Sequence, residues 1–186
     1  MKPFFSTVWS TIWVTVFLIG LTLPMSASAH GPSRVKQTEI IIVDAPPEKV
    51  WELIGDFGGI HRWHPDVEKT ESTGGNEPKA TRVIMLKNGG VIHELLKKYD
   101  AEAMTYQYRI TEVNVKVLPV KNYSSKVILT PTEDGGTQVT WQGAFYRGYM
   151  GNDPPPELNE DAAQAAVSKV YTVGLKNLKK LAEAGN

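Results

Sequence analysis

APPEKVWELIGDFGGIHRWHP, residues 45–65, decides the fold of this chain. Pro47 at a first helical position loses no hydrogen bond, because that amide has no partner inside a helix. Apolar residues then recur at helical spacing, at Val50, Leu53, Ile54 and Phe57. Gly58 and Gly59 end this helix, and a second helical turn follows. Pro65 favours an extended chain before it, so two abutting short helices lead into a strand.

Seven strands with hairpin connections are predicted around this unit. The ranges are Thr38–Val43, Asp66–Thr73, Thr81–Lys87, Val91–Tyr99, Met104–Val113, Tyr123–Thr130 and Thr137–Tyr146. Asn88-Gly89-Gly90 and Glu133-Asp134-Gly135-Gly136 accept positive φ, which tight hairpins need. Residues 30–36 are expected to be a flexible lead-in. Strands in hairpin order favour one antiparallel sheet.

The C-terminal segment predicts the longest helix. It follows Pro154-Pro155-Pro156, with acidic residues in its first turns and lysines in its last, as the helix dipole prefers. Apolar residues form one stripe along it, at Ala163, Val167, Val170, Gly174, Leu178 and Leu181. Such a stripe must be covered, and a curved sheet is the only predicted surface large enough. The fold class is therefore α+β, with a helix on an antiparallel sheet.

The first residues are typical of a secretory signal. Lys2 precedes an apolar run from Val8 to Leu23, and Ala27-Ser28-Ala29 is a small-x-small cleavage pattern. We expect a signal peptide at residues 1–29 and one mature domain at residues 30–186. The alternative is an uncleaved anchor, but Thr11 and Thr15 interrupt the run and make it short for a span. Cleavage would export the protein and leave no stable membrane span.

Composition excludes several classes of function. The 20 basic and 20 acidic residues balance, whereas nucleic-acid binding needs a basic face. The chain has no cysteine, so thiolate metal sites and thiol nucleophiles are excluded. No phosphate loop, nucleotide fingerprint or Ser-His-Asp order stands out. We expect no cofactor.

The residues already described resemble a known family. Residues 45–51, Asp56-Phe57 and Trp63-His64-Pro65 are similar to the opening motif of the START/Bet v1-like (SRPBCC, polyketide cyclase/dehydrase-like) superfamily. Glu94, Tyr108 and Trp141 extend the resemblance over most of the chain from Val35 onward. It implies the helix-grip fold, in which about seven strands of a curved antiparallel sheet hold a long C-terminal helix beside two short ones.

A narrower resemblance implies a cellular role. The exported context and residues 118–123, LPVKNY, resemble the MxaD-like accessory proteins of periplasmic methanol oxidation. That likeness implies a periplasmic location and, as partners, methanol dehydrogenase and its cytochrome acceptor. Nothing in the spacing of the residues itself predicts this role.

Two glycines predict close contact between the sheet and the helix. Along the last strand Val139, Trp141, Gly143 and Phe145 share a face. Gly143 and Gly174 leave gaps that either form a cavity or only let the helix approach closely, and both interpretations stay open. If a pocket forms, we expect it to be lined by Trp63, Ile92, Glu94, Leu96, Tyr106, Tyr108, Ile110, Trp141, Phe145, Val167, Tyr171 and Gly174.

Glu94 is the candidate polar group of that pocket. If Ile92 and Leu96 point inward, Glu94 is buried among apolar residues, and burial raises the pKa of an unpaired carboxyl. In the alternative register the inward residues are His93, Leu95 and Tyr99. The resemblance supports the first register, because a glutamate at the matching place often faces the cavity in that superfamily.

The function predicted from all this is binding of an apolar or amphipathic small molecule, or docking to a partner protein, without catalysis. The rival is a cyclase or dehydratase that uses Glu94 with Tyr108 or His64 as its acid-base pair. A lipid carrier is a third hypothesis. His61 with His64, or an amino-terminal His30, would bind a metal only with further ligands that the sequence does not place nearby. The apolar loops 117–120 and 148–151 are predicted gates or docking patches.

Overall fold

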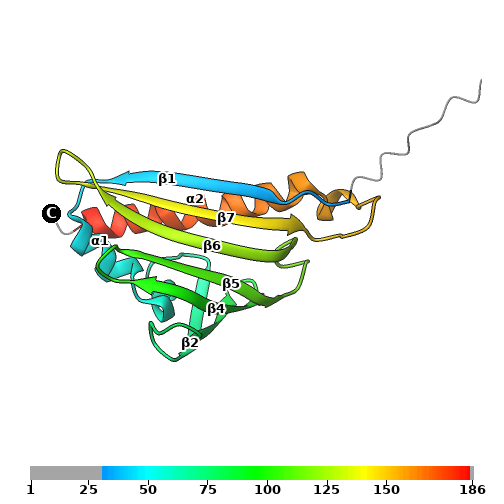
Figure 1. Ribbon diagram of the computed structural model, residues 1–186, viewed down its shortest axis with the longest axis horizontal. Helices are drawn as coiled ribbons and strands as arrows, with labels where there is room; N and C mark the ends of the chain where they lie inside the picture. The colour runs from blue at the N-terminus through cyan, green and yellow to red at the C-terminus, as the bar shows by residue number, and fades with distance from the viewer. Residues whose placement is uncertain (1–30, 185–186) are drawn as a thin grey trace, which may run out of the picture.

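The computed structural model describes residues 31–184, in which seven antiparallel strands curve around a long C-terminal helix (Figure 1). The strands are β1 (Val35–Val43), β2 (Val67–Thr73), β3 (Thr81–Leu86), β4 (Val91–Asp100), β5 (Thr105–Val113), β6 (Val120–Pro131) and β7 (Thr137–Arg147). The α-helices are α1 (Pro47–Ile54) and α2 (Glu160–Glu183), and two 3₁₀ helices are η1 (Phe57–Arg62) and η2 (Pro156–Leu158). The α+β helix-grip prediction is confirmed.

The sheet order, β1-β7-β6-β5-β4-β3-β2, explains why two short helices follow β1. β1 and β2 are consecutive strands but form opposite edges of the sheet. α1 and η1 carry the chain from one edge to the other, and η1 packs against β2. Asp56 caps η1, because its carboxylate accepts a hydrogen bond from the Gly58 amide at 3.0 Å. The stretch that decides the fold is therefore the bridge between the two edges.

The predicted strands all form, but the lead-in prediction is wrong at its C-terminal end. β1 begins at Val35, which pairs with Phe145 of β7. Arg34 also donates a hydrogen bond to the Ser124 hydroxyl at 2.9 Å. Cross-strand pairing therefore orders residues that carry no strong strand signal of their own. The predicted signal peptide, and His30, lie outside the described residues.

α2 lies across the concave face of the sheet, beneath β1 and β7 (Figure 1). Asn159 caps it by accepting from the Ala162 amide at 2.8 Å. The buried positions are Ala163, Val167, Tyr171, Gly174, Leu175, Leu178 and Ala182. The predicted stripe is wrong at Leu181, which stays 39% exposed while Ala182 takes the buried place. No helix between residues 31 and 184 is long and apolar enough to cross a membrane.

Gly143 and Gly174 allow the sheet and α2 to pack closely, and neither position leaves a cavity. A methyl group at Gly143 would overlap the hydroxyl of Tyr171, whose ring stacks on Trp141 with centroids 4.3 Å apart. A methyl group at Gly174 would lie 2.6 Å from the His64 ring. Aromatic side chains therefore fill both gaps. The interpretation of these glycines as packing positions is the correct one.

Gly143→Ala tests this packing. We expect the variant to lose about 1–3 kcal/mol of unfolding free energy, because the new methyl group displaces the Tyr171 hydroxyl. The same substitution in a Tyr171→Phe background should cost less, because the overlapping oxygen is gone. Urea denaturation of the four proteins measures the coupling. Equal costs of Gly143→Ala in both backgrounds would contradict the assignment.

Candidate functional site

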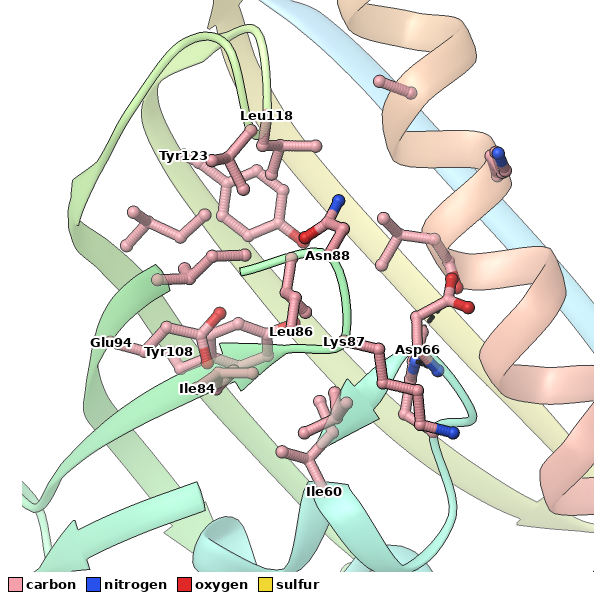
Figure 2. A pocket seen from close by; sticks show the side chains of 18 of the residues that line it. Ile60, Asp66, Ile84, Leu86, Lys87, Asn88, Glu94, Tyr108, Leu118 and Tyr123 are labelled. Carbon is pink, nitrogen blue, oxygen red and sulfur yellow. Dashed lines mark hydrogen bonds between the residues drawn. The ribbon is translucent and has the colours of Figure 1, made fainter. Parts of the chain in front are cut away.

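A cavity of about 440 Å³ lies between the inner face of the sheet and α2 (Figure 2). It lies beside the place where β5 and β6 separate: their pairing ends at Arg109 and Ser124, although β5 continues to Val113. The loop of residues 114–119 covers this end. A turn formed by the loop's own backbone holds it, with the Val117 amide donating to the Asn114 carbonyl at 2.8 Å. The cavity is therefore a consequence of the divergence of two strands.

Apolar side chains make most of the cavity wall. They come from η1, β2, β3, β4, β5, the covering loop and α2, and are Ile60, Val67, Ile84, Leu86, Ile92, Ile110, Val117, Leu118, Ala166 and Val170. Exposed polar residues mark the end nearest solvent, namely Asp66, Lys87, Asn88 and Lys169. Buried polar residues also line it, namely His64, Glu94, Tyr108 and Tyr123. An amphipathic ligand matches this distribution of polarity.

Glu94 lies on the inner face between Ile92 and Leu96, so the predicted inward register is confirmed. Its Oε2 accepts a hydrogen bond from Arg82 Nε at 2.6 Å, and both side chains are almost fully buried. Arg82 is the opposite residue on β3, and its guanidinium lies 4.2 Å from the Phe57 ring centroid and 5.0 Å from that of Tyr108. The pair therefore ties β3, β4 and η1 together.

Two opposing effects act on the carboxyl of Glu94. Burial raises its pKa, and the charge and hydrogen bond of Arg82 lower it by less, so the net shift is upward. Burial lowers the pKa of Arg82, but Glu94, Tyr106 and Tyr108 raise it, with a net rise that keeps the guanidinium charged. Glu94 lines the cavity as well as binding Arg82. It is therefore oriented for a ligand by a permanent cation.

A second polar group joins Tyr108, Tyr123, Ser125, Trp141 and Tyr171. The Trp141 indole Nε1 donates to the Tyr108 hydroxyl and to Ser125 Oγ, both at 3.0 Å. Ser125 Oγ donates to the Gln142 carbonyl at 2.8 Å and lies 3.1 Å from the Tyr171 hydroxyl. The Tyr123 and Tyr171 hydroxyls are 2.5 Å apart. The Trp141 indole thus finds partners without water, whereas the buried Trp63 indole Nε1 has no hydrogen-bond partner among residues 31–184.

Tyr108 is a member of this network that also borders the cavity. Its hydroxyl accepts from Trp141, and the side chain of Ser125 also hydrogen-bonds to it. Burial raises the pKa of Tyr108 far above that of an exposed tyrosine, so the phenol keeps its proton at neutral pH. Because Tyr108 lines the cavity, it is placed to donate that proton to an oxygen of a bound ligand.

His64 also lines the cavity but is held by both ring nitrogens. Its Nε2 lies 3.0 Å from the Val170 carbonyl, and its Nδ1 accepts from the Asp66 amide at 3.3 Å. Burial lowers its pKa, which favours this neutral form. A ring whose donor and acceptor are both engaged is a poor acid or base. His61, by contrast, is exposed, so the two histidines do not share one side as a metal site would require.

The structure brings together five of the twelve predicted pocket residues: Ile92, Glu94, Tyr108, Ile110 and Trp141. The other seven do not line the cavity, namely Trp63, Leu96, Tyr106, Phe145, Val167, Tyr171 and Gly174. These seven are buried in the core, where the close approach of α2 at Gly143 and Gly174, and the packing of Tyr106 on Trp51 and Phe57, leave no space. Sequence reasoning missed Arg82 and Tyr123. The hairpin at Asn88-Gly89 was a usable signal, because it places Arg82 opposite Glu94.

Comparisons with known proteins agree with this architecture. A family model described as polyketide cyclase / dehydrase and lipid transport matches residues 34–183. XoxI from Bacillus cereus is 28% identical, with a TM-score of 0.67 over 79% of this chain and 94% of that chain. A Thermobifida fusca protein is 28% identical, with a TM-score of 0.65 over 79% and 92%.

A more distant structure shares the fold alone. The Zhui aromatase/cyclase from Streptomyces sp. R1128 is 18% identical, with a TM-score of 0.67 over 81% of this chain and 94% of that chain. A search of curated protein sequences finds no significant match.

Replacing Arg82 tests the buried ion pair. We expect Arg82→Met to lose about 3–5 kcal/mol of unfolding free energy, because it leaves the Glu94 carboxylate buried without its partner. The double variant Arg82→Met/Glu94→Leu should be more stable than the single one. Arg62→Met is the matched control, since the exposed Arg62–Asp56 pair should contribute at most about 1 kcal/mol. Equal losses in Arg82→Met and the control, measured in urea, would contradict the role of the pair.

Proposed function

Because the chain belongs to the polyketide cyclase/dehydrase and lipid-transport family, we propose that it is an exported binding protein for an amphipathic small molecule. The molecule occupies the cavity between the sheet and α2. Its apolar part contacts the isoleucine and leucine walls, and its polar oxygen contacts Tyr108 and Glu94. The protein performs no reaction on it.

The observation that carries this proposal is the composition of the cavity. A volume of about 440 Å³ is within the usual range for small-molecule sites. Its walls are mostly apolar, and two of the four buried polar residues that line it, Tyr108 and Glu94, are each held in place by a neighbouring side chain. Trp141 fixes Tyr108, and Arg82 fixes Glu94. Fixed donors and acceptors in an apolar wall orient a ligand without a cost of reorganisation.

Blocking the cavity is the direct test. Ile110→Trp should abolish binding, because the larger ring points into the cavity. Thr111→Trp is the matched control, since Thr111 is exposed one residue further along β5. Native mass spectrometry of each protein, purified from its own host, measures the bound mass. A ligand retained by Ile110→Trp, or no ligand in the unaltered protein, would contradict the proposal.

Tyr108→Phe should weaken binding of the cavity ligand about three- to tenfold, because the variant loses the hydroxyl that contacts the ligand's oxygen.

A cyclase or dehydratase is the second candidate, favoured by one observation. Glu94 has a raised pKa and lines the same cavity as the Tyr108 phenol, an arrangement that suits proton transfer. His64 is a weaker candidate because both its ring nitrogens are engaged. Glu94→Gln separates the two proposals. It abolishes turnover of the cavity ligand if the protein is an enzyme, whereas a binding protein shows no turnover with either residue.

Export and a protein partner belong to the same proposal. We place the protein in the periplasm on the strength of the signal-like segment at residues 1–29. Assistance to methanol oxidation, with methanol dehydrogenase and its cytochrome as partners, is supported only by the resemblance of residues 118–123. Leu118 is buried against the cavity, so it is not available for docking. Tyr149 and Met150 are 41% and 47% exposed and are the better candidates.

Tyr149→Ser/Met150→Ser tests docking through this loop. If the dehydrogenase or its cytochrome binds here, the double variant should lose most of the capture in a pull-down, because apolar contact area is removed. Ile40→Ser/Ile42→Ser is the control, since these residues are similarly exposed on β1. Unchanged capture by the loop variant would rule out this surface. Ligand content should be the same in both variants.

A further inference from the structure

The outer face of the sheet carries a second hollow, of about 600 Å³, that the proposed function does not use. It lies on the side of the sheet away from α2. Its rim includes five basic residues, from β1, β4, β5 and β6: Lys36, Lys97, Lys98, Arg109 and Lys126. The remaining lining is uncharged, and no aspartate or glutamate lines it.

The strand register explains how these cations gather. In one row across the sheet Gln107 is opposite Lys126, and Lys126 is opposite Gln142. In the next row Arg109 is opposite Ser124, and Ser124 opposite Ala144, which pairs with Lys36. Short side chains at Ser124 and Ala144 thus lie between long basic ones. The small residues form the floor of the hollow, and the cations form its rim.

None of these five cations forms an ion pair with a carboxylate in the described part of the chain. The ion pairs found in residues 31–184 involve Arg62, Lys69, Arg82, Arg147 and Lys179, and none of these lines the hollow. Arg34 adds a further positive charge, since its guanidinium reaches Ser124 at the floor. The whole chain has a formal net charge of zero, so this is a local concentration of charge. Like charges held this close repel one another, and a bound anion would relieve the repulsion.

We propose that this hollow binds a small soluble anion that carries at least two phosphate groups. Cations in two adjacent rows, Lys126 in one and Arg109 with Lys36 in the next, match two anionic groups. The side chains of Gln107, Gln142 and Thr38 provide further hydrogen bonds. A hollow with a raised basic rim encloses a compact anion better than it fits a flat bilayer. The site is separated from the inner cavity by the sheet, so both can be occupied together.

Isothermal titration calorimetry with inorganic pyrophosphate, at low ionic strength, tests the proposal. We expect the unaltered protein to bind pyrophosphate more tightly than orthophosphate, and the affinity to fall as salt is added. Arg109→Gln/Lys126→Gln should weaken binding about tenfold, because two rim charges are removed. Lys176→Gln/Lys180→Gln is the matched control, since it removes the same charge from the exposed face of α2. Equal weakening by both double variants would show non-specific attraction and overturn the proposal.

A second variant distinguishes a site with a defined shape from a surface that attracts anions by its charge alone. Ala144→Leu keeps every charge but fills the floor between Lys36 and Ser124. It should reduce pyrophosphate affinity by at least about tenfold, with the inner cavity still able to hold its ligand. Full affinity in Ala144→Leu would overturn the proposal. Failure of the unaltered protein to bind pyrophosphate would also overturn it, including where it binds vesicles of anionic phospholipid, since the partner would then be a lipid surface.

Discussion

The position of α2 on the sheet depends on one contact, that of the Tyr171 ring with Trp141 and Gly143 of β7. Only glycine leaves room for the tyrosine hydroxyl at this point, and Gly174 similarly admits the rings of Trp63 and His64 from the bridge between the sheet edges. These contacts bring the helix against one half of the sheet. In the other half β5 and β6 diverge, and the sheet does not come as close to α2. The space left between them is the cavity.

The polar groups of the cavity are part of the same packing. Tyr108 receives a hydrogen bond from Trp141, whose other acceptor, Ser125, also contacts Tyr171. Glu94 is held by Arg82, which in turn donates to the Phe57 carbonyl at 2.5 Å and lies over the Phe57 ring. The residues that would recognise a ligand are therefore also the residues that join the sheet to η1 and α2. A substitution at Tyr108 or Glu94 therefore changes the packing of the core as well as the recognition of a ligand.

Sequence patterns predicted the sheet and the long helix because each depends on local periodicity and on turn residues such as Gly89 and Gly135. The inward face of β4, including Glu94, also followed from alternation. The position of the cavity did not follow, because the lengths over which β5 and β6 pair leave no local signature. Seven predicted pocket residues accordingly lie in solid core. Arg82 has no local signal in the sequence, because only the register of the hairpin at Asn88-Gly89 places it opposite Glu94.

The loop that covers the cavity has a consequence for kinetics. Residues 114–119 form their own turn, with Val117 beside Gly90 of the neighbouring hairpin and Pro119 beside Gly148 after β7. Local opening of such a segment requires far less free energy than global unfolding. The rate of ligand exchange would therefore depend on the opening of this loop, while α2 remains packed against Gly143. Residence time and thermal stability would then vary independently among relatives that differ only in this segment.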